Sequence, residues 1–149
     1  MSKELTPDGL IVIAILTVAV LVGFLWILIK ARMNDGIAEI PAFLLLGWDG
    51  AAWGPNIIVI NKDYWNKKPL IAHERCHQDQ QRKDGWLTFY FRYFTSKEWR
   101  LKYELEAYRV WVAVAPEDIH RIVNVMMNSY GFNLSYSDAL EALTKEEAV

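Results

Sequence analysis

The chain has 149 residues, of which 53% are hydrophobic, so it is long enough for one compact domain but too short for two once an N-terminal segment is set aside. Its formal net charge of -2 at pH 7 excludes the excess of basic surface that is typical of nucleic-acid-binding proteins. We therefore expect no nucleic-acid partner. Its single cysteine, Cys76, excludes a disulfide within the chain.

An uncharged apolar run occupies residues 9–29. At about 1.5 Å rise per residue, a helix over this run would cross a hydrocarbon core of roughly 30 Å. We therefore predict a transmembrane helix over residues 9–29, preceded by an N-terminal tail over residues 1–8 and followed by one domain over residues 30–149.

Basic residues flank this run unequally. Lys30 and Arg32 follow the run, whereas Lys3 precedes it. Because basic residues favour the cytoplasmic side of a membrane, the pattern predicts a single-pass membrane protein whose soluble domain lies on the cytoplasmic side. Membrane lipid, and other membrane proteins, would then be among its partners.

The domain after the run is predicted to be of the α+β class and mainly helical. Two apolar stretches, residues 41–46 and 57–60, are separated by a segment rich in the turn formers Gly, Asp, Pro and Asn. They predict a short β-hairpin or a pair of strands, and the β-branched residues 57–60 form the better strand. The aromatic segment 86–94 is interpreted mainly as core packing. Boundary residues and periodicity predict helices over residues 69–83, 96–115, 116–130 and 137–143.

The helix predicted over residues 69–83 carries the sequence His-Glu-Arg-Cys-His, from His73 to His77. Residues four apart lie about 40° apart around a helix axis, so both imidazoles face one metal ion. Glu74 projects about 100° from His73, which suits a general base that holds a water rather than a ligand. The pattern H-E-x-x-H on a helix predicts a zinc (Zn²⁺) site, with Glu74 activating a zinc-bound water.

A catalytic zinc ion also needs a third protein ligand, and two glutamates on the helix predicted over residues 96–115 are candidates. Glu104 lies in a mostly apolar stripe of that helix, whereas Glu106 lies beside Lys102 and Arg109 at spacings that suit surface ion pairs. Since a lone buried carboxylate is costly unless it is paired or metal-bound, Glu104 is the preferred ligand and Glu106 the alternative. An ion pair between Glu104 and Arg100 is the competing interpretation.

With HERCH on one helix and ELEAY on a later one, the chain resembles the gluzincin group of zinc metallopeptidases, in a minimal membrane-anchored version. The resemblance covers about residues 57–112. It implies His73, His77 and Glu104 as zinc ligands and Glu74 as the catalytic residue. It also implies that residues 57–60 form an edge strand that pairs with an extended peptide. Integral-membrane gluzincins carry aspartate where this chain has Tyr108, so no supporting role transfers to that position.

Other polar residues have weaker assignments. Tyr108, Arg109, His120 and Tyr130 are the candidates for stabilising a reaction oxyanion, and the sequence does not choose among them. Cys76 points away from both motif histidines and is interpreted as a packed thiol. The glutamines that follow the motif, Gln78, Gln80 and Gln81, are candidates for orienting a histidine through a hydrogen bond.

The sequence thus predicts a membrane-anchored zinc peptidase that hydrolyses peptide bonds of a peptide or protein substrate. The alternative is a non-catalytic membrane or assembly protein whose zinc site only braces a small domain. Glu74 favours the enzyme, because a structural site does not need an acid beside its first histidine. Structural zinc sites are also usually closed by four protein ligands.

Overall fold

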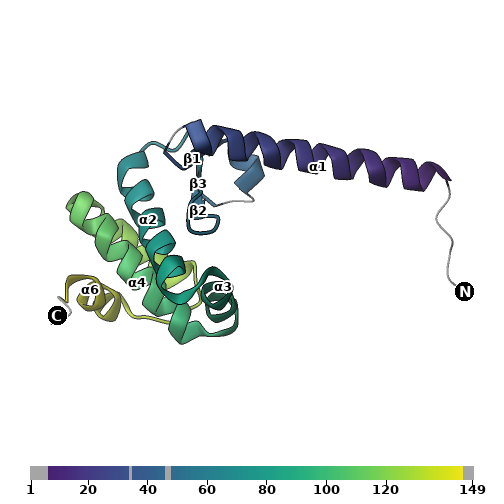
Figure 1. The fold of residues 1–149 in the computed structure, drawn as a ribbon. Coiled ribbons are helices and arrows are strands. Elements are labelled where there is room, and N and C mark those ends of the chain that lie inside the picture. Colours follow the sequence, from purple (N-terminus) through teal and green to yellow (C-terminus); the bar gives the residue numbers. More distant parts are fainter. Residues whose placement is uncertain (1–6, 34, 46–47, 146–149) are drawn as a thin grey trace, which may run out of the picture.

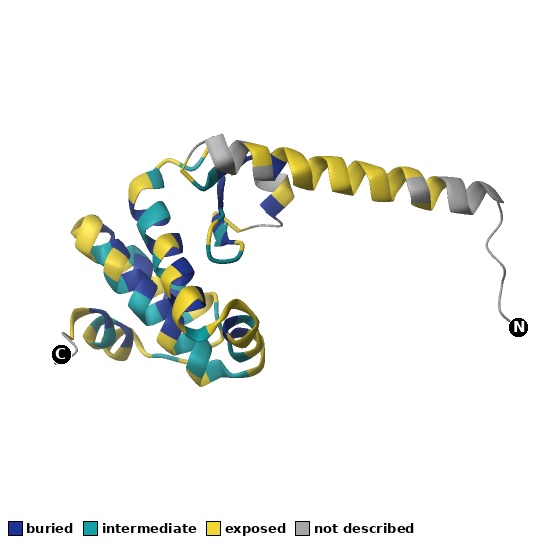
Figure 2. Ribbon diagram, in the orientation of Figure 1, coloured by how far each residue is buried: buried dark blue, intermediate teal, exposed yellow. Residues whose placement is uncertain are grey.

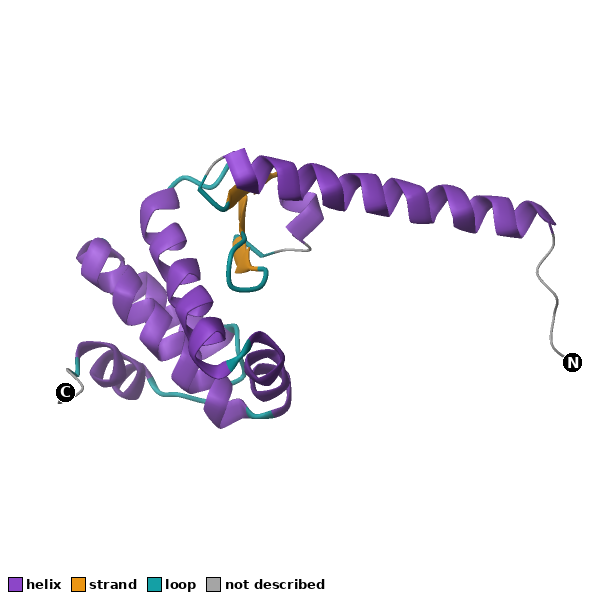
Figure 3. Cartoon of the chain, in the orientation of Figure 1, coloured by secondary structure: helices purple, strands orange, loops and turns teal. Residues whose placement is uncertain are grey.

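The computed structural model of the chain describes residues 7–33, 35–45 and 48–145. Most of the described chain is helical, with one small sheet (Figure 3). The helices are α1 (Pro7–Met33), α2 (Lys67–Asp84), α3 (Trp86–Thr95), α4 (Lys97–Val114), α5 (Ile119–Asn128) and α6 (Tyr136–Thr144), the 3₁₀ segments are η1 (Ala42–Leu45) and η2 (Pro116–Asp118), and the strands are β1 (Ile37–Ile40), β2 (Gly50–Ala52) and β3 (Ile58–Asn61).

Helix α1 extends away from the other helices (Figure 1). Nearly all of its described side chains are exposed (Figure 2). Ile27, near its C-terminal end, is buried in a cluster with Ala38, Ile40, Leu45 and Val59. This cluster attaches the end of α1 to one face of the sheet.

Across the described residues, no helix combines the length and the apolar character needed to cross a membrane. This finding corrects two predictions, the transmembrane helix over residues 9–29 and the single-pass membrane location that followed from it. Residues 1–6 of the predicted N-terminal tail lie outside the described residues.

The sheet has the order β1-β3-β2, with β1 parallel and β2 antiparallel to β3. Alternate residues of β3 face two different cores, Val59 the cluster with α1 and Ile58 and Ile60 the larger helical cluster. A strand that is apolar on both faces must be covered on both, which places it in the middle of a sheet. The expectation that residues 57–60 form an edge strand is therefore wrong, and β2 is the edge strand beside the helices.

The strand expected over residues 41–46 is also replaced. Its described part forms the 3₁₀ segment η1, in which the Leu44 amide donates to the Pro41 carbonyl at 3.0 Å. Pro41 has no amide hydrogen to donate to a neighbouring strand. The pairing with β3 is made instead by the residues before it, 37–40, which form β1.

The turn that leads into β1 depends on Gly36, whose φ is +83°. A Cβ atom at Gly36 would lie 2.7 Å from the Asn56 carbonyl oxygen, whereas one at Gly54, with φ of +73°, would meet open space. We expect Gly36→Ala to lower the free energy of unfolding by about 2–3 kcal/mol and Gly54→Ala by about 1 kcal/mol, because both substitutions strain the backbone but only the first adds a clash. Denaturant unfolding of the two variants checks this, and equal losses would contradict the proposed clash.

The helices predicted over residues 69–83, 96–115 and 137–143 correspond to α2, α4 and α6, and the aromatic segment 86–94, for which no helix was predicted, lies in α3. Ser96 caps α4, since its side chain accepts a hydrogen bond from the Trp99 amide at 3.3 Å. Residues 116–130 are divided into η2 and α5. Helix α2 packs against α4, α3 and strand β2 (Figure 1), and this packing brings together the residues that carry the chemistry.

Candidate metal centre

The three predicted ligands meet between α2 and α4. His73 and His77 come from successive turns of α2, and Glu104 comes from α4; their exposed fractions are 5%, 7% and 2%. The two Nε2 atoms are 3.1 Å apart. Glu104 places Oε2 at 3.5 Å from Nε2 of His73 and Oε1 at 3.7 Å from Nε2 of His77. The group could hold a metal ion, since one ligand atom of each residue lies within 4.8 Å of the others.

These spacings of 3.1–3.7 Å are close to those between the ligands of a tetrahedral ion. A zinc ion bonded at about 2.0–2.2 Å to atoms at the corners of a tetrahedron places those atoms about 3.3–3.6 Å apart. Oε2 of Glu104 is also buried with no hydrogen-bond partner among the described residues. A buried carboxylate oxygen without a partner is costly, and a cation between the three side chains would satisfy it.

Glu104 and the two histidines form one electrostatic unit. Burial lowers the pKa of His73 to about 3, so this imidazole is neutral and able to bind metal. Burial alone would also lower the pKa of His77, but the Glu104 carboxylate raises it to about 9. In turn, burial alone would raise the pKa of Glu104, but the nearby His77 lowers it to about 2. A cation bound here therefore displaces the proton that His77 otherwise holds.

Glu74 lies beside this group without belonging to it. It is 5% exposed, and burial raises its pKa to about 7. A hydrogen bond to the Ala52 backbone favours its charged form. A Cβ atom on Gly50 would lie 3.1 Å from Oε1 of Glu74, so the glycine leaves room for the carboxylate next to β2. A carboxyl group with a pKa near neutrality can both take up and release a proton.

Tyr93 of α3 is a member of the site that the sequence pattern did not indicate. Its hydroxyl donates to Oε1 of Glu104 at 2.6 Å. Burial raises the pKa of Tyr93 well above its usual range, so it remains a donor and holds one carboxylate oxygen in place. The aromatic segment 86–94 was expected to be core, and nothing in the local sequence distinguishes Tyr93 from its neighbours. Only the packing of α3 on α4 does so.

The alternative ligand, Glu106, is not part of the metal-binding group. It is half-buried and accepts a hydrogen bond from Nε2 of Gln80 at 2.7 Å. The competing partner for Glu104, Arg100, donates instead to the Tyr93 carbonyl at 3.1 Å. Both observations favour Glu104 as the third ligand.

Of the four candidates for stabilising a reaction oxyanion, two line the cleft and two do not. Tyr108 and Tyr130 line the cleft beside the metal-binding group, and their hydroxyls are 2.8 Å apart. Arg109 donates to the Ala142 carbonyl of α6, and the exposed His120 pairs with Tyr136. Neither Arg109 nor His120 is among the described residues that line the cleft.

Burial raises the pKa of the Cys76 thiol to about 12, as expected for a packed thiol.

The cleft has a volume of about 720 Å³ and reaches from β2 across α2, α3, α4 and α5. Apart from Glu74 and the ligands, the charged residues among its described lining are Asp49 and Arg121. At the α3 end the lining is aromatic, with Trp53, Tyr90 and Phe94. The metal-binding group is thus reached through a mostly apolar cleft.

No family model, curated protein or solved structure matches the chain. Its class is therefore defined by the fold and site alone. It is a small, mainly helical protein in which a buried group of two histidines and one glutamate could hold a metal ion beside a second, separate carboxyl group.

Proposed function

We propose that the protein is a zinc-dependent peptidase. The observation that carries the proposal is Glu74, a buried carboxyl group with a pKa raised to about 7, one residue along the helix from a metal-binding histidine. Two imidazoles and one carboxylate are the donor set of a catalytic zinc site, which keeps its fourth position open. Zinc bound there would polarise the scissile carbonyl and lower the pKa of the attacking water.

The residues of the chain perform the rest of the reaction. His73, His77 and Glu104 hold the ion, and Tyr93 fixes the orientation of the Glu104 carboxylate. Glu74 takes a proton from the attacking water and passes it to the amine that leaves when the C–N bond breaks. Tyr130 and Tyr108 lie in the cleft as hydroxyl donors for the carbonyl oxygen, which becomes negatively charged during the attack.

The cleft suits an extended peptide. Strand β2 borders the cleft and has a sheet neighbour only at β3 among the described residues. A peptide that lies in the cleft along β2 would pass the metal-binding group, beside Ala52, whose backbone groups already bond to Glu74, Gln81 and Tyr90. In this proposal, the strand beside the substrate is β2 and not the strand of residues 57–60.

A bracing role for the metal site is the alternative function, and two observations count against it. The described metal-binding group has three members rather than the four that usually close a structural site. Glu74 is also buried at a cost that a purely structural site has no need to bear. Peptide hydrolysis by the zinc-loaded protein, compared with its Glu74→Gln variant, tests the choice directly.

The aromatic end of the cleft predicts a preference for large apolar residues near the cleaved bond. Phe94 lines the cleft and is 68% exposed, so a substrate side chain can cover it. Since burying part of a phenylalanine ring is worth about 1–2 kcal/mol, we expect Phe94→Ser to raise the KM for an apolar peptide about tenfold and to leave kcat nearly unchanged. Steady-state kinetics with a fluorogenic peptide measure this.

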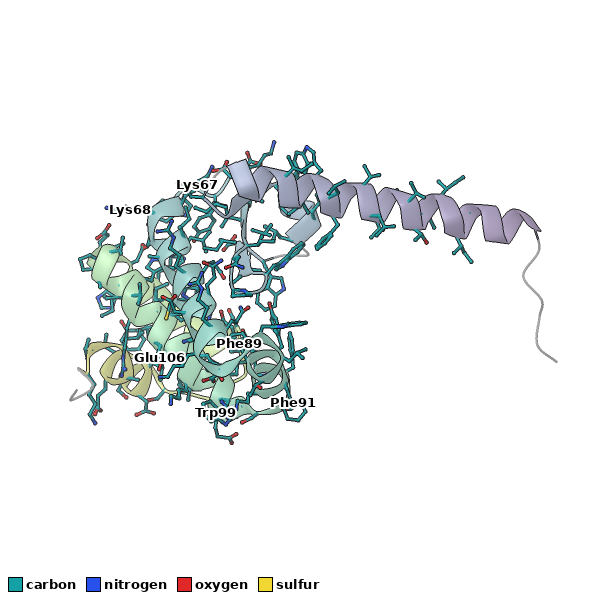
Figure 4. All side chains as sticks on the ribbon, in the orientation of Figure 1. Lys67, Lys68, Phe89, Phe91, Trp99 and Glu106 are labelled. Atoms are coloured by element: carbon teal, nitrogen blue, oxygen red, sulfur yellow. The ribbon has the colours of Figure 1, made fainter. Side chains whose placement is uncertain are left out.

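Phe91 provides the matched control. It lies on the same helix, is 70% exposed and is not among the described cleft-lining residues (Figure 4). Phe91→Ser should leave KM within about twofold of the parent value, because a side chain that the substrate does not cover contributes nothing to binding. Equal changes in both variants would contradict the preference.

A further inference from the structure

Gln80 connects the metal-binding group to the glutamate that was its alternative ligand. The side chain is buried in α2, and its Oε1 is 2.8 Å from Nδ1 of His77. Its Nε2 lies 3.0 Å from the Tyr103 carbonyl oxygen and 2.7 Å from Oε2 of Glu106. All three partners are within hydrogen-bond distance of one carboxamide.

Hydrogen-bond chemistry allows this carboxamide only one orientation. A backbone carbonyl and an ionised carboxylate can only accept hydrogen bonds. The Tyr103 carbonyl and the Glu106 carboxylate must therefore both face the NH₂ group of Gln80. Oε1 of Gln80 must then face His77, and since this oxygen can only accept, Nδ1 of His77 must carry a proton. The lone pair of the neutral imidazole is therefore on Nε2, which is the atom nearest to His73 and Glu104.

We propose that Glu106 is a positioning residue of the metal centre, acting through Gln80 to hold His77 in the Nδ1-protonated form that binds metal through Nε2. The proposal rests on the metal-binding part of the proposed function and does not depend on peptide hydrolysis. It gives Glu106 a function other than ligation. The Tyr103 carbonyl also helps to orient the Gln80 carboxamide, so loss of Glu106 should remove only part of the orientation of His77. Loss of Gln80 should remove all of it.

The experiment measures zinc affinity of the full chain by competition with a chromophoric chelator. Loss of a partner that orients a metal-binding histidine typically weakens metal binding 10–100-fold. We expect Gln80→Leu to weaken zinc binding within that range and Glu106→Leu to weaken it about tenfold. Glu106→Gln is the matched control, since its amide oxygen still accepts from Gln80, and it should bind zinc within about twofold of the parent chain.

The double variant distinguishes positioning from a general structural effect. If Glu106 acts through Gln80, the Gln80→Leu/Glu106→Leu chain should bind zinc no more weakly than Gln80→Leu alone. Losses that multiply in the double variant would overturn the proposal, as would parent-like affinity of Glu106→Leu.

A measurement on the unsubstituted chain covers the case in which these variants do not fold. In the zinc-loaded protein, NMR should show a slowly exchanging proton on Nδ1 of His77. It should also show the Gln80 amide protons close to Tyr103 rather than to the His77 ring. Amide protons of Gln80 facing His77 would overturn the proposal whether or not any peptide is hydrolysed.

Discussion

Glu74→Gln is expected to lower kcat for peptide hydrolysis about 10²–10⁴-fold, which is the usual contribution of a general base. The amide has nearly the shape of the carboxyl group but cannot accept the proton of the attacking water. Zinc content should not change, because Glu74 is outside the metal-binding group. Hydrolysis of a fluorogenic peptide and metal analysis of the same samples measure the two effects together.

The same substitution should not destabilise the protein. Burial raises the pKa of Glu74 to about 7 from 4.5, so between these values the unfolded chain binds fewer protons at this position than the folded chain. Stability contributed by this group therefore falls as the pH rises from about 4.5 to 7. Glutamine does not ionise and avoids this loss. The melting temperature of Glu74→Gln at pH 7 should be equal to or above that of the parent chain.

Asp79→Asn is the matched control for Glu74→Gln. Asp79 is an exposed acid of the same helix that pairs with Arg82 and is not among the described residues that line the cleft, so the substitution removes an acidic group outside the cleft. It should leave kcat unchanged. Undiminished hydrolysis by Glu74→Gln would overturn the general-base role of Glu74, and no hydrolysis by the zinc-loaded parent chain would favour a metal site that only braces the domain.

Zinc should raise the melting temperature of the chain, and Glu104→Gln should remove most of that rise. At a free zinc concentration about a thousand times the dissociation constant, binding adds about 4 kcal/mol to the free energy of unfolding, which corresponds to roughly 10–20 °C for a domain of this size. An amide in place of the carboxylate removes the negative charge and leaves a neutral, weaker oxygen donor in the ligand set. Thermal unfolding with zinc and with a chelator measures the difference.

Glu106→Gln serves as the comparison, because it makes the same chemical change on the same helix outside the ligand set. It should retain the zinc-dependent rise. The quantity to compare is the rise and not the melting temperature itself, since the pKa of Glu104 is lowered by His77 and the metal-free protein also loses this stabilising pair. A rise lost in Glu106→Gln and retained in Glu104→Gln would reverse the ligand assignment.

The positions of the motif and of the third candidate ligand were predictable because their signals are local. The four-residue spacing of His73 and His77 places both side chains on one face of any helix, and the apolar neighbours of Glu104 indicated that it is buried. The structure brings these three residues together as predicted. The identity of zinc and the peptidase activity stay predictions.

The errors arose where a neighbouring element decides the outcome. Residues 57–60 are apolar on both faces, which suits a strand in the middle of a sheet. The sequence does not say which strands lie on either side of them. The Gln80 contact with Glu106 joins helices α2 and α4, and the Tyr93 contact with Glu104 joins α3 and α4. Helical periodicity reports which face of a helix is buried but not which residue lies opposite.

One residue of β2, Ala52, contacts both Glu74 and an aromatic side chain of the cleft, Tyr90. The Ala52 backbone bonds to Glu74, and the Ala52 carbonyl accepts from Gln81 at 3.1 Å and from Tyr90 at 2.7 Å. Outward displacement of this strand would break the bond that favours the ionised form of Glu74 while it frees Tyr90. The pKa of Glu74 and the position of the Tyr90 side chain in the cleft are therefore coupled through a single amino acid that has no functional side chain.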